Sequence, residues 1–438
     1  MADNVIIGWR RALGLSALFG LAPAAAVPQD LGPGGLQYRF TAAQSFTAET
    51  DFALQSLGSG GAGFGATELA FGISSETRTQ RIALTAGTTF RLAPSFTQPG
   101  SNDASDPFVQ FDYRRDAARS GLQFSASHMR DAIAFTDVYT GVIGDDGTLL
   151  PLSAPDDFEG AGTRSTSVVT ARMDTGRDMP LAFDFGVSAI LTEYSETTDP
   201  DLEDSLSVSA DIGARLALSS AVTGRFRLEV ASREEDDLAD TRSESTSLLF
   251  GVDYEPTSTF SLSAELGPIW EQERSFGITT DDTGLTGSLS AVWSLPQSEL
   301  SLSFSGSDVA DDSSFATSLD WSRTNRNGLF VARASYDVAP GDATDPEETT
   351  AFLGMGYLFE LNSLSQLGLA LAFSSTDTEG DPRSEPSFSI GASYRRDLGR
   401  NTALHTGYEF RTRDEILDGS SSSHSIFMRV TFDTEGLF

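Results

Sequence analysis

Three histidines and one glycine-rich segment are the residues of this chain whose types could support catalysis or nucleotide binding. His128, His405 and His424 lie far apart in the sequence, and no two have the spacing of metal ligands on one helical turn. No serine stands in the glycine-flanked turn of a hydrolase nucleophile. The segment Gly58–Gly63 fits a dinucleotide-loop pattern on paper, but no helix follows it to present an N-terminus to phosphate. We therefore expect neither an enzyme nor a bound cofactor.

Two acidic segments carry the oxygen ligands that Ca²⁺ and Mg²⁺ prefer. They are Asp199–Asp204 and Glu234–Asp237, and neither has the loop pattern of an EF-hand. We interpret them as a solvated acidic rim, neutralised by the divalent cations that bridge lipopolysaccharide. The alternative is a specific Ca²⁺ or Mg²⁺ site in these loops.

The charge balance excludes one large class of partners. The chain has 63 acidic and 29 basic residues, a net charge of −34, and every basic residue is an arginine. Binding to nucleic acid needs clustered positive charge, so we expect no nucleic-acid partner. The absence of cysteine excludes a disulfide scaffold and a thiolate metal site.

The first 26 residues have the pattern of a secretory signal peptide. A basic segment ends at Arg11, an apolar run spans Ala12–Leu21, and small residues precede a cleavage point near Ala26. The run is too short for a membrane-spanning helix, which needs about 20 residues. Residues 27–35 would then form a short periplasmic segment, which leaves no room for an N-terminal plug.

Strict alternation of apolar with small or polar residues fills the chain from Leu36 to Phe432. Leu206, Val208 and Ala210 alternate with Ser207 and Ser209, and this period of two indicates a strand with two different faces. About twenty such stretches (18–22) predict an all-β, antiparallel up-and-down transmembrane barrel over 36–432. We expect their centres near residues 43, 69, 87, 111, 129, 169, 187, 211, 230, 250, 266, 289, 304, 319, 333, 355, 371, 391, 407 and 427.

The connections alternate between short turns and longer acidic loops, as in outer-membrane barrels. Residues 255–259 and 294–298 are examples of the first kind, and residues 196–204 and 342–348 of the second. A soluble β-sandwich or β-helix would also alternate, but it has no reason to place aromatics at both ends of its apolar face. We expect one aromatic ring near the short turns (Tyr113, Tyr254, Trp293, Trp321, Phe359, Tyr394, Phe432) and another near the loops (Trp270, Tyr336, Tyr408, Phe410).

The face opposite the apolar one carries charges of both signs, which are tolerated where a lumen holds water. Arg225 and Asp253 would face each other across a hairpin centred near residue 239. Such residues either line a hydrated pore or brace its wall through ion pairs. The pore-lining candidates are Arg39, Arg81, Arg172, Arg225, Arg227, Asp253, Glu265, Arg333, His405, Glu409, Arg411 and Arg429.

The longest connection, residues 141–163, is the third external loop in this topology. Its position matches that of the loop that constricts general porins. The alternative, which we favour from sequence, is a hairpin with residues 144–147 at its tip, rising above the membrane. The candidate constriction residues are Asp145, Asp146, Asp156, Asp157 and Glu159.

Leu36–Leu54, Ser75–Leu92 and Phe108–Ser127 resemble a group of proteobacterial outer-membrane proteins classed as β-barrel porins of uncharacterised function. The resemblance is one of general sequence pattern and extends over the whole barrel. It implies an outer-membrane barrel of a Gram-negative bacterium, but no substrate. Residues 433–438 would form a C-terminal tail, so either Phe432 or Phe438 would be read by the barrel-assembly machinery. The oligomeric state is left open.

From these observations we expect a porin-like channel for passive diffusion of small hydrophilic solutes, surrounded by outer-membrane lipid and lipopolysaccharide. The alternative is a structural or export-partner barrel, for example one that passes a polysaccharide or serves secretion.

Overall fold

The computed structural model describes residues 35–50, 61–92, 104–135, 141–144, 146–150, 162–197, 202–309, 312–339, 347–378, 384–415 and 419–437. The predicted signal peptide and nearly all of the segment 27–35 lie outside these residues, so both stay predictions.

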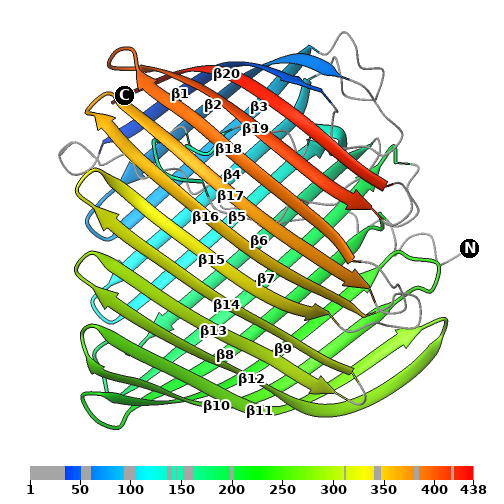
Figure 1. Ribbon diagram of the computed structural model, residues 1–438. Coiled ribbons are helices and arrows are strands. Elements are labelled where there is room, and N and C mark those ends of the chain that lie inside the picture. Colours follow the sequence, from blue (N-terminus) through cyan, green and yellow to red (C-terminus); the bar gives the residue numbers. More distant parts are fainter. Residues whose placement is uncertain are drawn as a thin grey trace, which may run out of the picture.

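Twenty antiparallel strands form one sheet, and pairing of the first strand with the last closes it into a barrel (Figure 1). The strands cross the barrel wall diagonally, and each is hydrogen-bonded to its neighbours in sequence. They are β1 (Leu36–Glu49), β2 (Ala62–Glu76), β3 (Gln80–Leu92), β4 (Ala104–Ala117), β5 (Ser120–Ala132), β6 (Thr163–Thr175), β7 (Leu181–Ser195), β8 (Ser205–Ala217), β9 (Val222–Glu235), β10 (Arg242–Thr257), β11 (Phe260–Ser275), β12 (Ile278–Leu295), β13 (Ser298–Val309), β14 (Asp312–Asn325), β15 (Gly328–Ala339), β16 (Glu348–Asn362), β17 (Ser365–Thr378), β18 (Ser384–Asp397), β19 (Thr402–Glu415) and β20 (Gly419–Leu437).

This architecture confirms the predicted fold class and strand number. Each expected centre falls within one observed strand. The prediction succeeded because alternation is the direct consequence of a pleated strand whose two faces meet different surroundings.

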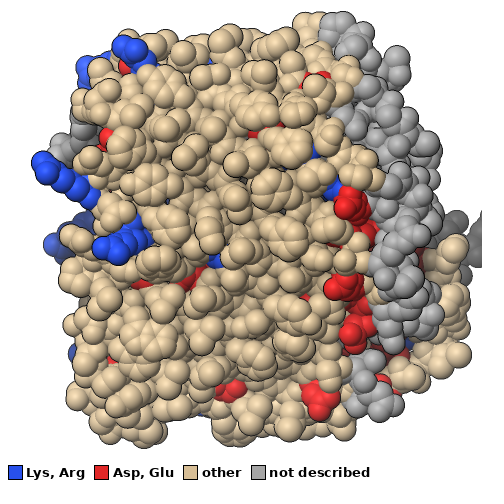
Figure 2. All heavy atoms as spheres, viewed as in Figure 1, with Lys and Arg blue, Asp and Glu red and all other residues tan. Residues whose placement is uncertain are grey.

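The outward face of the barrel is apolar and exposed. Phe46 is 54% exposed and Leu266 is 61% exposed, whereas Thr47, on the opposite face of β1, is 4% exposed. Figure 2 shows a broad central band with few charged atoms between the two ends of the barrel. An apolar belt of this extent would not be stable against water and indicates contact with lipid tails.

The strands are long enough to cross a bilayer. The shortest, β13 and β15, have 12 residues, and a tilted transmembrane strand needs about 9–11. Among the described residues, no helix is long and apolar enough to span a membrane.

Aromatic residues occur on the outward face near both ends of the strands, as predicted. Four exposed members lie near the short turns, and three lie near the opposite end. The first set is Tyr254, Trp293, Trp321 and Phe432, and the second is Trp270, Tyr336 and Tyr408.

The C-terminal boundary differs from the prediction. Residues 433–437 do not form a tail, because β20 continues to Leu437, which pairs with Gln37 of β1. Asp433 and Glu435 belong to the inward register at the mouth of the barrel, where water is accessible. Charged side chains are therefore accommodated there, and the strand continues through them. The ion pair between Arg39 and Asp433 also links β1 to β20.

Candidate pore and its charged wall

The twelve predicted lumen residues all stand on the register opposite to the exposed apolar residues, which faces the barrel interior. Arg225, for example, is paired in register with Gly251, while its sequence neighbour Phe226 is paired with Phe250, and both phenylalanines are exposed outside. The structure gathers eight of the twelve into two clusters of ion pairs.

The first cluster lies on β9, β10 and β11. Glu265 is its centre: it accepts from Arg225 at 3.2 Å and also from Arg227, and its side chain is 8% exposed. Arg225 reaches Asp253 as well, with 3.4 Å between Nη1 and Oδ1. The Arg225–Asp253 contact confirms the predicted pairing, although the hairpin register places Gly251 directly opposite Arg225.

The second cluster lies on β1, β2, β18, β19 and β20. Arg429 donates to both carboxylate oxygens of Glu68, at 2.5 and 2.9 Å. Arg411 lies 3.3 Å from Glu409 and 3.9 Å from Glu49. Glu68 is partly exposed, whereas Arg429, Arg411, Glu409 and Glu49 are largely buried. Fixed ion pairs therefore order this part of the polar wall.

His405 belongs to this second cluster. Its Nε2 accepts a hydrogen bond from Nε of Arg395 at 3.0 Å. The other histidines have separate partners: His128 contacts Ser167, and His424 contacts Tyr408. Among the described residues no histidine bonds another, and no group of three or more His, Asp or Glu is arranged to hold a metal ion.

The remaining candidates stand apart from the clusters. Arg39 pairs with Asp433. Arg333 lies 3.7 Å from Asp320 on the adjacent strand. Arg81 and Arg172 make no side-chain ion pair or hydrogen bond with another described residue.

The sequence reasoning missed Glu49, Glu68 and Arg395. All three stand on the inward register of their strands, so parity alone would have found them. Strand order adds more specific information. β1 lies between β2, which carries Glu68, and β20, which carries Arg429, and the two side chains meet across β1.

Residues 141–144 and 146–150, which belong to the connection after β5, lie inside the barrel. They form a small hairpin, with Ile143 paired to Leu149 and the amide of Leu150 donating to the carbonyl of Val142. The amide of Val142 donates to Ser393 Oγ of β18 at 3.1 Å, and Val142 packs against Phe427 of β20. Both wall residues face inward, so the hairpin above the membrane that we favoured from sequence is wrong for these residues.

Inward-facing glycines of the wall make room for this hairpin. A Cβ on Gly368 of β17 would lie 2.7 Å from Ile143 Cγ1, and one on Gly356 of β16 would lie 2.6 Å from Leu149 Cδ2. Real carbon atoms do not approach so closely, so a larger residue at either position would displace the hairpin. Sequence patterning could not reveal this seat, because glycine on a strand has several explanations.

The hairpin tip reaches the end of the barrel that carries the short turns. Gly147 adopts a φ of +80°, which favours glycine, and a Cβ there would lie 2.8 Å from Gln366 Oε1 and 3.0 Å from Arg395 Nη1. Asp146 closes the tip by accepting from the amide and hydroxyl of Thr148, at 2.9 and 2.7 Å. Of the other constriction candidates, Asp145, Asp156, Asp157 and Glu159 lie outside the described residues.

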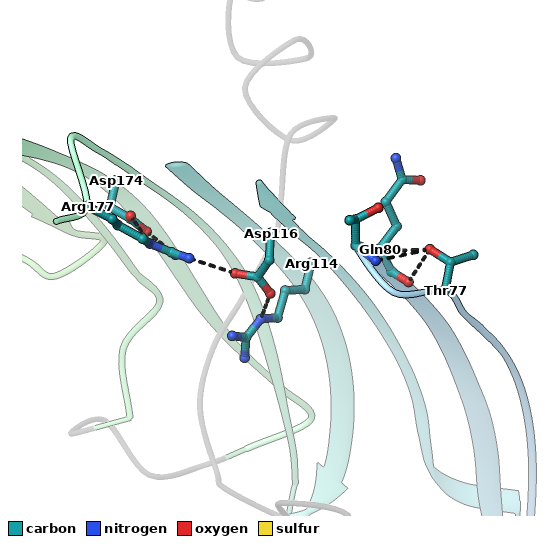
Figure 3. Close-up of polar contacts among 7 residues, drawn as sticks. Thr77, Gln80, Arg114, Asp116, Asp174 and Arg177 are labelled. Atoms are coloured by element: carbon teal, nitrogen blue, oxygen red, sulfur yellow. Dashed lines mark hydrogen bonds and ion pairs between the residues drawn. The ribbon is translucent and has the colours of Figure 1, made fainter. Parts of the chain in front are cut away.

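At the short-turn rim, the β6–β7 turn is tied to the end of β4 (Figure 3). Arg177, in the β6–β7 turn, donates to Asp174 at 2.6 Å and to Asp116 of β4 at 3.0 Å. Asp116 also accepts from Arg114 at 2.6 Å. The hydrogen bonds that Arg177 donates to Asp174 and then to Asp116 raise the pKa of its guanidinium above the usual range.

Several solved structures share this fold. The FrpB iron transporter from Neisseria meningitidis aligns as its F5-1 variant apoprotein with a TM-score of 0.54 and 6% identity, over 92% of this chain and 81% of that chain. Its F3-3 variant aligns with a TM-score of 0.52 and 6% identity, over 92% and 82%. The copper transporter OprC aligns with a TM-score of 0.50 and 9% identity, over 92% and 82%.

At these identities the likeness concerns the fold alone, and the chain is a closed, all-antiparallel barrel like these transporters. No protein-family model matches the chain. No curated protein sequence matches it either. The resemblance to proteobacterial β-barrel porins therefore stays a prediction.

Proposed function

We propose that this protein is an outer-membrane channel for passive diffusion of small hydrophilic solutes, with its pore narrowed by the hairpin of residues 142–150. The apolar outer belt and two aromatic rings support a membrane location. The fold shared with proteins described as transporters favours transport over a purely structural role.

The observation that carries the proposal is the docked hairpin. A barrel of 16–18 strands already leaves an aqueous lumen, and 20 strands enclose a wider one. An unobstructed lumen of that width would pass solutes with little selection. A hairpin held along β16–β20 by Ser393, Phe427 and the glycine seat occupies part of that width.

The inner wall formed by β7–β10, away from the docked hairpin, favours a hydrophilic solute. Across β7–β10 the inner surface has a shallow hollow whose lining combines apolar side chains with serine hydroxyls, among them Ser188, Ser207, Ser209 and Ser243, and with Arg233. The charged cluster around Glu265 lies on the same side of the barrel. Hydroxyls and fixed charges of both signs replace water around a polar solute without favouring one net charge strongly.

Single-channel recording in planar bilayers tests this function. The folded barrel, recognised by its shift in electrophoretic mobility on heating, is expected to give steady conductance steps in potassium chloride. A folded barrel with no conductance would contradict passive diffusion, and would point instead to a carrier that opens only when energised.

A further inference from the structure

Three strands that run toward the short turns end with the same outward-facing pair of residues, an aromatic followed two positions later by arginine. The pairs are Tyr113 and Arg115 on β4, Trp321 and Arg323 on β14, and Tyr394 and Arg396 on β18. Because side chains alternate along a strand, each arginine follows its aromatic on the outer face, on the turn side of the apolar band.

The surroundings of the three arginines are alike. In each case one neighbouring strand places an apolar residue directly beside the arginine, and the other places a hydrogen-bonding residue there. The apolar neighbours are Leu122, Phe330 and Leu404, and the polar neighbours are Gln80, Ser298 and Ser365.

On β14 and β18 the aromatic side chain also bonds the serine beside its arginine. Trp321 Nε1 donates to Ser298 Oγ at 2.8 Å, and the Tyr394 hydroxyl donates to Ser365 Oγ at 3.2 Å. These bonds fix the aromatic at the border of the apolar band, next to the guanidinium.

The guanidinium groups of Arg115, Arg323 and Arg396 are exposed, and none makes an ion pair or hydrogen bond to another described residue. Their sequence neighbours on the inward face behave differently. Arg114 pairs with Asp116, and Arg395 bonds His405 and Asp397. The carboxylates Asp116 and Asp397 at this end thus pair with the inward-facing arginines. The outward-facing guanidinium groups can therefore bind a ligand outside the barrel.

The opposite end of the outer face is acidic on balance. Figure 2 shows basic side chains at the short-turn end and acidic ones beside the loops. Among the described residues near the loop ends of the strands, six exposed outward-facing acids outnumber three exposed outward-facing arginines; the acids are Glu193, Glu244, Asp281, Asp308, Asp377 and Asp414, and the arginines are Arg130, Arg242 and Arg274.

We propose that Arg115, Arg323 and Arg396 bind the phosphate groups of anionic glycerophospholipids in the periplasmic leaflet. A guanidinium offers a fork of donors that matches phosphate oxygens. Its aliphatic stem lies along the apolar neighbour while its charged head reaches the headgroup region. The proposal rests on the outer-membrane location in the proposed function and takes the short-turn end as periplasmic, as is general for such barrels, but it does not depend on conduction.

The test compares two triple variants in vesicles of zwitterionic phosphatidylethanolamine with and without phosphatidylglycerol. One variant carries Arg115→Gln, Arg323→Gln and Arg396→Gln. The control carries Arg78→Gln, Arg326→Gln and Arg400→Gln, which removes the same charge from turns at the same end. The readouts are phosphatidylglycerol retained on the purified protein, by native mass spectrometry, and the temperature at which electrophoretic mobility shifts.

The wild-type protein and the control are expected to retain phosphatidylglycerol and to gain thermal resistance from it. The outward variant is expected to lose this preference, by about fivefold in affinity for each arginine near a charged leaflet. Equal losses in both variants, or no loss in either, would overturn the proposal. Conductance of the outward variant should stay at the wild-type value, so failure here and failure of the proposed channel are distinguishable.

Discussion

Replacing Gly368 by alanine should loosen the hairpin that narrows the pore. The new Cβ would lie 2.7 Å from Ile143 Cγ1 and 3.3 Å from both Ile143 Cδ1 and Ser393 Oγ. Carbon atoms pack best at about 3.5–4.0 Å, so the hairpin must shift by nearly 1 Å or leave its seat.

The expected size of the effect follows from packing energies. Burial of Val142 and Ile143, which are 5% and 3% exposed, contributes about 1.5–3 kcal/mol for each side chain before the loss of loop entropy. Overpacking by one methyl group costs about 1–3 kcal/mol. The ratio of docked to released hairpin should therefore fall by about 5–150-fold.

Single-channel recording measures this ratio as the fraction of time spent at the higher conductance level. Gly399→Ala is the matched control, because a Cβ at Gly399 meets nothing within 4 Å. Ile143→Ala should also release the hairpin, and the two changes together should have less than the sum of their separate effects, because they act on one contact. A folded Gly368→Ala barrel with unchanged conductance would refute the role of the hairpin.

Three further predictions concern the charged residues. Glu265→Gln should release Arg225 and Arg227 and shift selectivity toward anions, measured as the reversal potential in a salt gradient, whereas Arg227→Gln should shift it the opposite way. Arg429→Gln leaves Glu68 without its bidentate partner and should lower stability by about 1–2 kcal/mol, since the pair is only partly exposed; urea unfolding of the detergent-solubilised barrel measures this, and a loss no greater than that of Arg114→Gln would contradict it. Burial opposes ionisation of Asp237, but hydrogen bonds from the Thr241 hydroxyl and amide hold the pKa of that carboxyl below its ordinary 3.8. The β9–β10 loop should therefore keep this stabilisation above pH 3.8 and lose it as the pH falls through the lowered value; hydrogen exchange at the Thr241 amide follows it, and loss near pH 6 would contradict the assignment.

Period-two alternation was sufficient to predict the strands, their number and the two faces, because it reflects the difference between lipid and water at every second residue. Which inward charges meet was harder to predict. Arg225 and Asp253 lie on one hairpin and could be paired from sequence. Glu68 and Arg429 come from opposite ends of the chain, and only closure of the barrel brings them together.

The inward hairpin was missed for a related reason. Its anchors are Ser393 and Phe427 and its seat is Gly356 and Gly368, all far from residue 142 in sequence. The loop itself reads as an ordinary turn rich in aspartate and glycine. The direction in which such a turn folds depends on complementary shape across the barrel, which a local pattern does not contain.

The contact between Val142 and Ser393 spans 251 residues of sequence. Loop closure over so long a stretch becomes favourable only when the intervening wall is in place. The hairpin emerges after the fifth strand but has no binding surface until strands β16–β20 are laid down. Its docking should therefore be among the last events of assembly, so that the growing barrel passes through a wider, unobstructed intermediate before it reaches its final bore.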